Sequence, residues 1–201
     1  MTTDALFAQL KHPNPYMRER AMVELAEAQA PGTIEKLLAN LGEDDVVYRR
    51  ASVKALGVMG PEAVPPIAKL LVESDNVTIR SSCAKALAQH ALNCGDEPFP
   101  QVGLDALKVS VTDDNPVVHI ASAMALGEIG PAALGIVTET LAITDNLSLA
   151  VSLTNALAAI GTPEAAETLK TIATDESVDD YVRESANSAL SRIDMVDQYS
   201  R

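Results

Sequence analysis

The chain of 201 residues contains no tryptophan, two phenylalanines, four tyrosines, three histidines and two cysteines. So few aromatic side chains do not favour a ready-made pocket for a large conjugated ligand. Cys83 and Cys94 are too few for a disulfide framework, which indicates a reducing compartment and therefore the cytoplasm. Their spacing also does not match a metal knuckle, so we expect no metal site, with Cys94 as the weak alternative.

Basic side chains are scarce as well. Fifteen Lys and Arg stand against 28 Asp and Glu, which gives a formal net charge of −13. Such a charge repels nucleic acid and anionic membrane surfaces, so neither is an expected partner. No uninterrupted apolar run approaches the roughly 20 residues that span a bilayer, and the N-terminal MTTDALFAQL does not resemble a signal peptide. We therefore expect an unexported protein without membrane insertion.

The chain does contain an internal repeat. The segment that starts at Asp44 can be laid over segments that start at Asp75, Asp113 and Asp145, and degenerate copies open and close the chain. Six copies of about 31 residues account for nearly the whole sequence. One leucine marks the same position in every copy, and we call these the phase leucines: Leu25, Leu56, Leu87, Leu126, Leu157 and Leu190.

Within each repeat the apolar residues follow helical spacing. Tyr48, Ala51 and Ala55 share one stripe of a first helix, and Val64 and Ile67 share a stripe of a second. No strand pattern competes with this spacing. The sequence therefore predicts an all-α, right-handed superhelix of HEAT-like helical hairpins. Short polar residues precede one helix of most pairs and predict N-caps, namely Asp45, Asn76, Asn115, Asn146 and Asp179.

We expect a single repeat domain over residues 1–201. The predicted hairpins cover residues 4–31, 32–62, 63–92, 100–131, 132–162 and 163–195. Between Leu87 and Leu126 the step is 39 residues instead of the usual 31, which places an insertion at residues 93–100.

The insertion contains Cys94, Asp96, Glu97 and Phe99. Insertions in helical solenoids form loops on one face, and that face often binds a partner. The alternative is a tolerated surface loop whose Phe99 packs back onto the helices.

Two columns of residues stand at fixed offsets from the phase leucines. Four positions earlier lies a mostly small column, expected where neighbouring helices approach closely: Ala21, Ser52, Cys83, Ser122, Leu153 and Ala186. Seven positions earlier lies a mostly basic column: Arg18, Arg49, Arg80, His119, Ala150 and Arg183.

The basic column has two interpretations. Its arginines pair with acidic or amide side chains of the preceding turn, such as Asp44 and Asp75, or Arg49 and Arg80 join Arg50 to bind acidic groups of a ligand or partner. At position 119 the column has a histidine instead of an arginine. One interpretation is that its imidazole changes charge near neutral pH and has a functional role there. The other is that the substitution arose by drift and has no functional role. The glycines of LGVMG and LGEIG are read as turn glycines, because the lysine and third glycine of a nucleotide loop are missing.

The repeat pattern, which reads D-x-x-V-x-R-x-A-x-x-x-A-L-G-x-x-G in the copy that starts at Asp44, resembles the short HEAT-like repeat of the cyanobacterial phycobilin lyase-like family. The resemblance to its small lyase subunits and to relatives linked to phycobilisome turnover implies a protein that handles phycobiliproteins or their bilins. The matching residues are Asp44, Val47, Arg49, Ala51, Ala55, Leu56, Gly57 and Gly60, then Asp113, Ala121, Ala125, Leu126, Gly127 and Gly130.

Three functions follow from this resemblance. The first is a non-catalytic cytoplasmic scaffold that binds a phycobiliprotein or a second HEAT-like subunit. The second is a bilin lyase subunit, of the carbon–sulfur lyase type, that attaches or removes phycocyanobilin by positioning it, with catalytic residues unknown. The third is an adaptor for an iron–sulfur scaffold protein, with Cys94 involved.

No cofactor is expected to be intrinsic, a bilin would be bound transiently, and an iron–sulfur cluster would come only through a partner. Candidate binding residues are Arg49, Arg50, Arg80, His119, Cys94, Asp96, Glu97 and Phe99.

Overall fold

The computed structural model describes residues 1–95 and 98–199, without the side chains of residues 194 and 196–199. Over these residues it contains twelve α-helices and no strand, which confirms the predicted all-α repeat fold. The chain divides into two compact units, Met1–Ala106 and Leu107–Arg201. The expectation of a single repeat domain over residues 1–201 stays a prediction.

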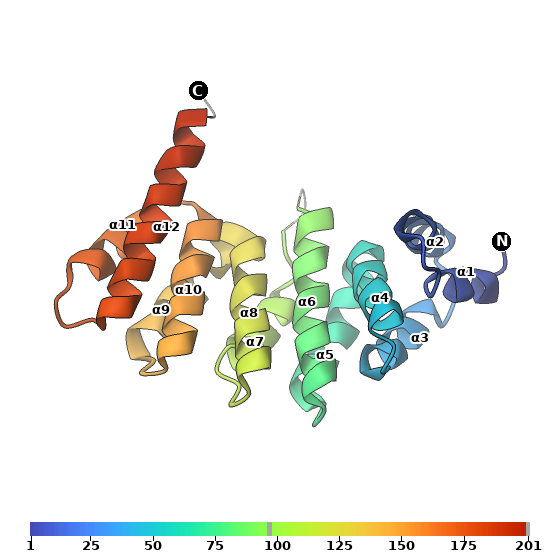
Figure 1. The fold of residues 1–201 in the computed structure, drawn as a ribbon. Coiled ribbons are helices and arrows are strands. Elements are labelled where there is room, and N and C mark those ends of the chain that lie inside the picture. The colour runs from blue at the N-terminus through green and yellow to red at the C-terminus, as the bar shows by residue number, and fades with distance from the viewer. Residues whose placement is uncertain (96–97, 200–201) are drawn as a thin grey trace. The chain divides into compact units, whose positions relative to one another are not determined.

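The first unit is built from helical pairs (Figure 1). In each pair the second helix is the longer, and α4 packs against both α2 and α6. The 3₁₀ turns η1 (Asn40–Gly42) and η2 (Pro61–Ala63) lie in the connections. The pairs are α1 (Thr3–Gln9) with α2 (Pro15–Ala28), α3 (Thr33–Ala39) with α4 (Val46–Val58), and α5 (Val64–Glu73) with α6 (Val77–Asn93).

The second unit repeats this arrangement. Its first helix, α7, crosses the boundary between the units, and α10 packs between α8 and α12 (Figure 1). The helices are α7 (Gln101–Ser110), α8 (Pro116–Ile129), α9 (Leu134–Ile143), α10 (Leu147–Ile160), α11 (Pro163–Thr174) and α12 (Asp180–Tyr199), with the 3₁₀ turn η3 (Gly130–Ala133) after α8.

The phase leucines and the small column lie in the core of each unit. All phase leucines except half-buried Leu190 have no solvent exposure, and every member of the small column is fully buried. Two hydroxyls of that column are satisfied by side chains of the preceding helix segment: Asn40 Nδ2 donates to Ser52 Oγ (3.2 Å), and the Ser110 and Ser122 hydroxyls lie 2.8 Å apart. Burial raises the pKa of Cys83 to about 12, so this thiol behaves as a small apolar residue.

The predicted N-caps are confirmed. Asp45 Oδ1 accepts from the amides of Val47 and Tyr48, and Asn76 Oδ1 accepts from those of Thr78 and Ile79. Asn115, Asn146 and Asp179 accept one amide each at the start of α8, α10 and α12. These bonds satisfy amides that have no partner within their own helix, so each longer helix begins at a fixed residue.

The prediction that both glycines of LGVMG and of LGEIG lie in turns is wrong for the first glycine of each segment. Gly57 lies inside α4, and a Cβ placed on it would meet Gln89 Cβ at 2.4 Å. Gly127 lies inside α8 in the same way, and a Cβ placed on it would meet the Cα of Ala156 at 3.2 Å. Only Gly60, with φ of 97°, and Gly130, with φ of 80°, have the turn conformation. The first glycine instead lets the next long helix approach.

One stretch is more apolar than the sequence expectation allowed. An 18-residue window within Pro116–Ile143 has a mean hydropathy of 1.6, so by length and composition alone the stretch could cross a bilayer. In the structure it is not one helix, because α8 ends at Ile129 and η3 separates it from α9. Core helices also pass this test, and 44% of that window is buried, so the stretch is weak evidence for a membrane span.

Candidate functional site

The basic column binds backbone carbonyls in the loop before its own helix. Arg49 Nη1 donates to the carbonyl of Glu43, and Arg80 Nη1 donates to that of Ser74 at 3.0 Å. Arg18 Nη1 donates to the carbonyl of His12 at 2.6 Å and also to Pro13. In each case the main acceptor lies six residues earlier. These three hydrogen bonds go to backbone carbonyls where the sequence predicts acidic or amide side chains, whereas Arg183 Nη2 does donate to the carboxylate of Asp180.

His119 occupies its place in the column by the same rule. Its Nδ1 lies 3.2 Å from the carbonyl of Asp113, again six residues earlier, and the ring is only 2% exposed. Nε2 is buried without a hydrogen-bond partner among the described residues. The imidazole therefore replaces the arginine as a short link to the loop, away from any open surface.

Arg49 and its neighbour Arg50 offer a direct test of this structural role. Replacing Arg49 by methionine keeps the apolar stem but removes the charged donor from the Glu43 carbonyl. Because hydrogen bonds to charged groups contribute about 1.5–3 kcal/mol, we expect the free energy of unfolding to fall by about 1.5 kcal/mol. Arg50→Met should change it by less than about 0.5 kcal/mol, since Arg50 is exposed. Urea unfolding followed by circular dichroism measures both, and equal effects would contradict the assignment.

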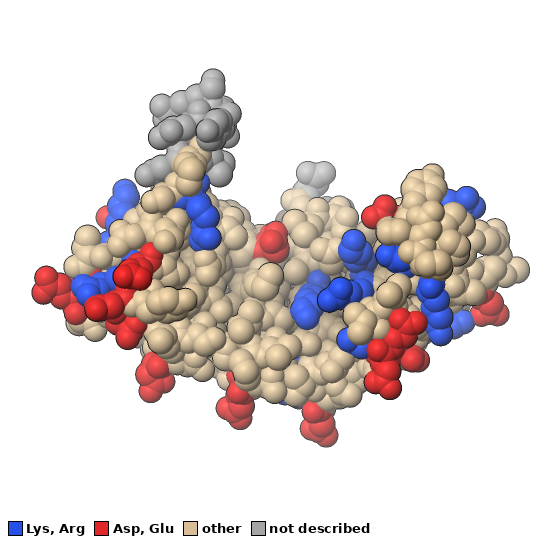
Figure 2. Space-filling model, in the orientation of Figure 1, with Lys and Arg blue, Asp and Glu red and all other residues tan. Residues whose placement is uncertain are grey.

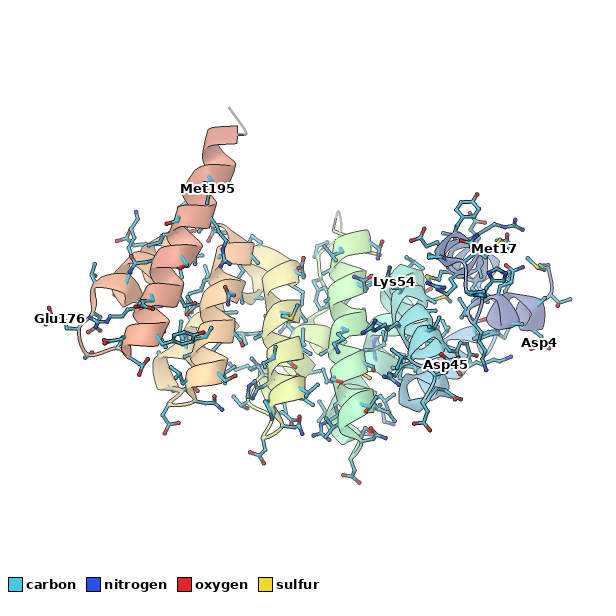
Figure 3. All side chains as sticks on the ribbon, in the orientation of Figure 1. Asp4, Met17, Asp45, Lys54, Glu176 and Met195 are labelled. Carbon is cyan, nitrogen blue, oxygen red and sulfur yellow. The ribbon has the colours of Figure 1, made fainter. Side chains whose placement is uncertain are left out.

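A cluster of free cationic side chains lies on α4 and α6, and we call Arg50, Lys54 and Lys85 the basic patch. All three are exposed, and none forms an ion pair within the described part of the chain. Figure 2 shows the blue side chains gathered over these two helices, and Figure 3 labels Lys54 on α4 beside α6. Of the predicted arginines, the structure thus makes Arg50 available for binding and engages Arg49 and Arg80 with loop carbonyls.

Sequence reasoning missed Lys54 and Lys85, although a signal was present. The two lysines are 31 residues apart and each stands two positions before a phase leucine. Equivalent positions of successive repeats lie side by side, so equal residues there form a patch.

The described part of the insertion packs back onto its own unit. The Phe99 ring meets buried His90 edge to face, with centroids 5.8 Å apart. A Cβ placed on Gly103 would meet Phe99 Cε1 at 2.6 Å, which shows how closely the ring lies against α7. Cys94 is half-buried at the C-cap of α6, and Asp96 and Glu97 lie outside the described residues. These contacts fit the alternative of a loop anchored by Phe99.

The second unit has a pocket of about 640 Å³ between α9–α10 and α11–α12. Leu147, Ala150 and Val182 contribute apolar surface, and Asp145, Asp175 and Asp179 contribute carboxylates. None of the described lining residues is aromatic, Lys or Arg. Such a lining does not suit an acidic conjugated bilin, so we place no bilin there. Among the described residues there is also no group of three or more His, Cys, Asp or Glu that could hold a metal ion.

The family of HEAT repeats matches residues 3–88 and 104–191 of the chain. Uncharacterized phycocyanin operon protein Z of Pseudanabaena tenuis is 46% identical over 201 residues, which cover all of both proteins. Bilin biosynthesis protein CpeZ of Synechococcus is 37% identical over 107 residues, which cover 53% of this chain and 58% of that protein.

The fold is also similar to a solved structure from Nostoc. The complex of CpcE and CpcF of phycocyanin lyase matches with a TM-score of 0.51 and 17% identity, over 77% of this chain and 96% of the matched chain. At this identity the likeness concerns the fold alone.

Proposed function

Because the chain belongs to the HEAT-repeat proteins, and among them to the phycobilin lyase-like family, we propose that it binds a protein partner in the handling of phycobiliproteins and their bilins. The observation that carries the proposal is the 46% sequence identity to the phycocyanin operon protein Z over the full length of both proteins. The name of the partially matching relative, a bilin biosynthesis protein, points in the same direction. The protein then acts in the cytoplasm, and its partner is a phycobiliprotein or a second HEAT-like subunit.

The basic patch is the surface that we assign to this partner. The three cations of the patch lie exposed on adjacent helices and attract carboxylates, although the chain as a whole has a net charge of −13. Complementary charges at an interface raise the association rate and select the orientation of the partner. Val23, on neighbouring α2, stands two residues before phase leucine Leu25, the position that Lys54 and Lys85 take in their repeats, and its exposed side chain adds apolar contact area.

Charge reversal of the basic patch tests the proposal. Arg50→Glu, Lys54→Glu and Lys85→Glu together should weaken binding to a purified phycobiliprotein by about tenfold or more, because like charges then face the partner. The matched control reverses Lys69, Lys108 and Lys170, which are exposed but already ion-paired. Surface plasmon resonance at two salt concentrations measures both, and circular dichroism checks folding. Equal weakening by the two triple variants would contradict the assignment of this surface.

Pigment transfer separates binding from catalysis. The chain is co-expressed with a bilin source and an acceptor phycobiliprotein, and the purified acceptor is examined by visible absorbance. Binding without covalent pigment supports the scaffold, whereas chain-dependent attachment or removal of pigment identifies a lyase subunit. Capture of iron–sulfur assembly proteins without any phycobiliprotein would overturn the proposal and favour the adaptor.

A further inference from the structure

The basic column is interrupted at Ala150, and this residue lies in the wall of the pocket. Thr144, six residues earlier, has φ −82° and ψ 134°, close to the −79° and 131° of Ser74, whose carbonyl accepts from Arg80. Asn146 caps α10 with nearly the same backbone angles as Asn76 at α6. The fifth repeat therefore reproduces the loop that receives an arginine in the third repeat, but it lacks the arginine.

The charges around the pocket favour a cation. Asp145, Asp175 and Asp179 are exposed lining residues, and Arg183 beside them is bound to Asp180 and does not line the pocket. The hydroxyl and amide of Ser177 donate to Asp175 and lower the pKa of its carboxyl, and the charge of Arg183 lowers it by a smaller amount, which keeps the carboxyl ionised at neutral pH.

The second unit as a whole is also negatively charged. Residues 107–201 contain five Lys and Arg against 14 Asp and Glu, whereas residues 1–106 contain ten against 14. A cation approaching the second unit therefore meets a field that attracts it before it reaches the pocket.

The remaining surface of the pocket suits an aliphatic stem. Ala150 and Val182 both line the pocket with apolar atoms, although they are only 8% and 4% exposed. Leu147 and Ile172 line the same pocket. Long basic side chains lay their methylene groups on such surface while the charged end binds polar groups.

We propose that this pocket binds one arginine side chain presented by a partner protein. The guanidinium donates to the Thr144 carbonyl and to the neighbouring carboxylates, and the methylenes lie on Ala150 and Val182. Arginine suits this site better than lysine because its planar fork of donors can serve a carbonyl and a carboxylate together. The inference rests on the proposed function only in taking the ligand from a protein, and it is tested without a phycobiliprotein.

The test uses the full ¹⁵N-labelled chain and two pentapeptides with blocked ends. One is Gly-Gly-Arg-Gly-Gly, and the other carries citrulline, a neutral isostere, in place of arginine. We expect saturable shifts of the Asn146, Leu147 and Val178 amides with the arginine peptide. The citrulline peptide should bind about tenfold or more weakly, because it loses the charge-assisted hydrogen bonds. Equal binding of the two peptides, or shifts confined to other parts of the chain, would overturn the proposal.

Two variants of the chain provide a second test of the pocket. Ala150→Arg fills the pocket from within, so the arginine peptide should lose its binding and the melting temperature should rise. Ser148→Arg is the control, because it adds the same charge at an exposed position of α10 that does not line the pocket. Unchanged peptide binding by Ala150→Arg would contradict the site, whereas loss in both variants would reduce it to nonspecific attraction. Failure of the phycobiliprotein experiment would leave these peptide results untouched.

Discussion

Replacing Gly57 by alanine is expected to lower the free energy of unfolding by about 1–3 kcal/mol, the usual cost of overpacking a well-packed site. The new Cβ would lie 2.4 Å from Gln89 Cβ and 2.9 Å from the Gln89 carbonyl carbon. Because one of these atoms belongs to the backbone of α6, a side-chain rotation cannot relieve the clash. The long helices must move apart, which also loosens the contacts of their neighbouring leucines.

Gly135 provides the matched control. It lies in helix α9, and a Cβ placed there meets no atom within 4 Å. Alanine favours helix over glycine, so Gly135→Ala should leave stability unchanged or raise it by up to about 1 kcal/mol. Equilibrium urea unfolding of both variants measures the difference. A neutral Gly57→Ala would show that α4 and α6 do not depend on this close approach.

Truncating a phase leucine is expected to have a still larger effect. Leu87 is fully buried in α6, and Leu87→Ala removes buried methyl and methylene groups and leaves a cavity. Such changes cost about 2–5 kcal/mol, with the exact value set by how far the surroundings relax. The loss should appear as a lower urea midpoint, measured by circular dichroism.

Leu92 is the control on the same helix. Its side chain is 58% exposed, so Leu92→Ala makes the same change in composition and helix propensity without a buried cavity. We expect a change within about 0.5 kcal/mol. Similar losses for Leu87→Ala and Leu92→Ala would mean that the phase leucines are not the main source of core stability.

The sequence predicts the features that depend on spacing along one helix. Leu87 is buried and Asn76 caps α6 because both roles follow from helical periodicity and from the position before the first turn. The two glycines of LGVMG show the limit of this reasoning. The sequence alone does not distinguish Gly57 from Gly60. Only the packing of α6 shows that Gly57 allows a close approach of helices, whereas Gly60 lies in a turn.

The candidate sites were only partly visible in the sequence. The gap in the basic column at Ala150 can be read from the repeat alignment, but it has no meaning until the carbonyl acceptors of Arg49 and Arg80 are known. Those acceptors depend on loop backbone angles, which side-chain spacing does not determine. The pocket further depends on where the loop after α11 places Val178, and the repeat pattern does not specify this loop.

The unequal lengths of the two helices in each pair have a consequence for motion. Helices as short as α1 and α3, with seven residues each, do not persist alone in water and exist only while they pack on their longer partners. Local opening is therefore expected to begin on the side of the short helices and to leave the longer ones intact. The basic patch, on α4 and α6, then lies on the part of its unit that holds its shape while the opposite side fluctuates.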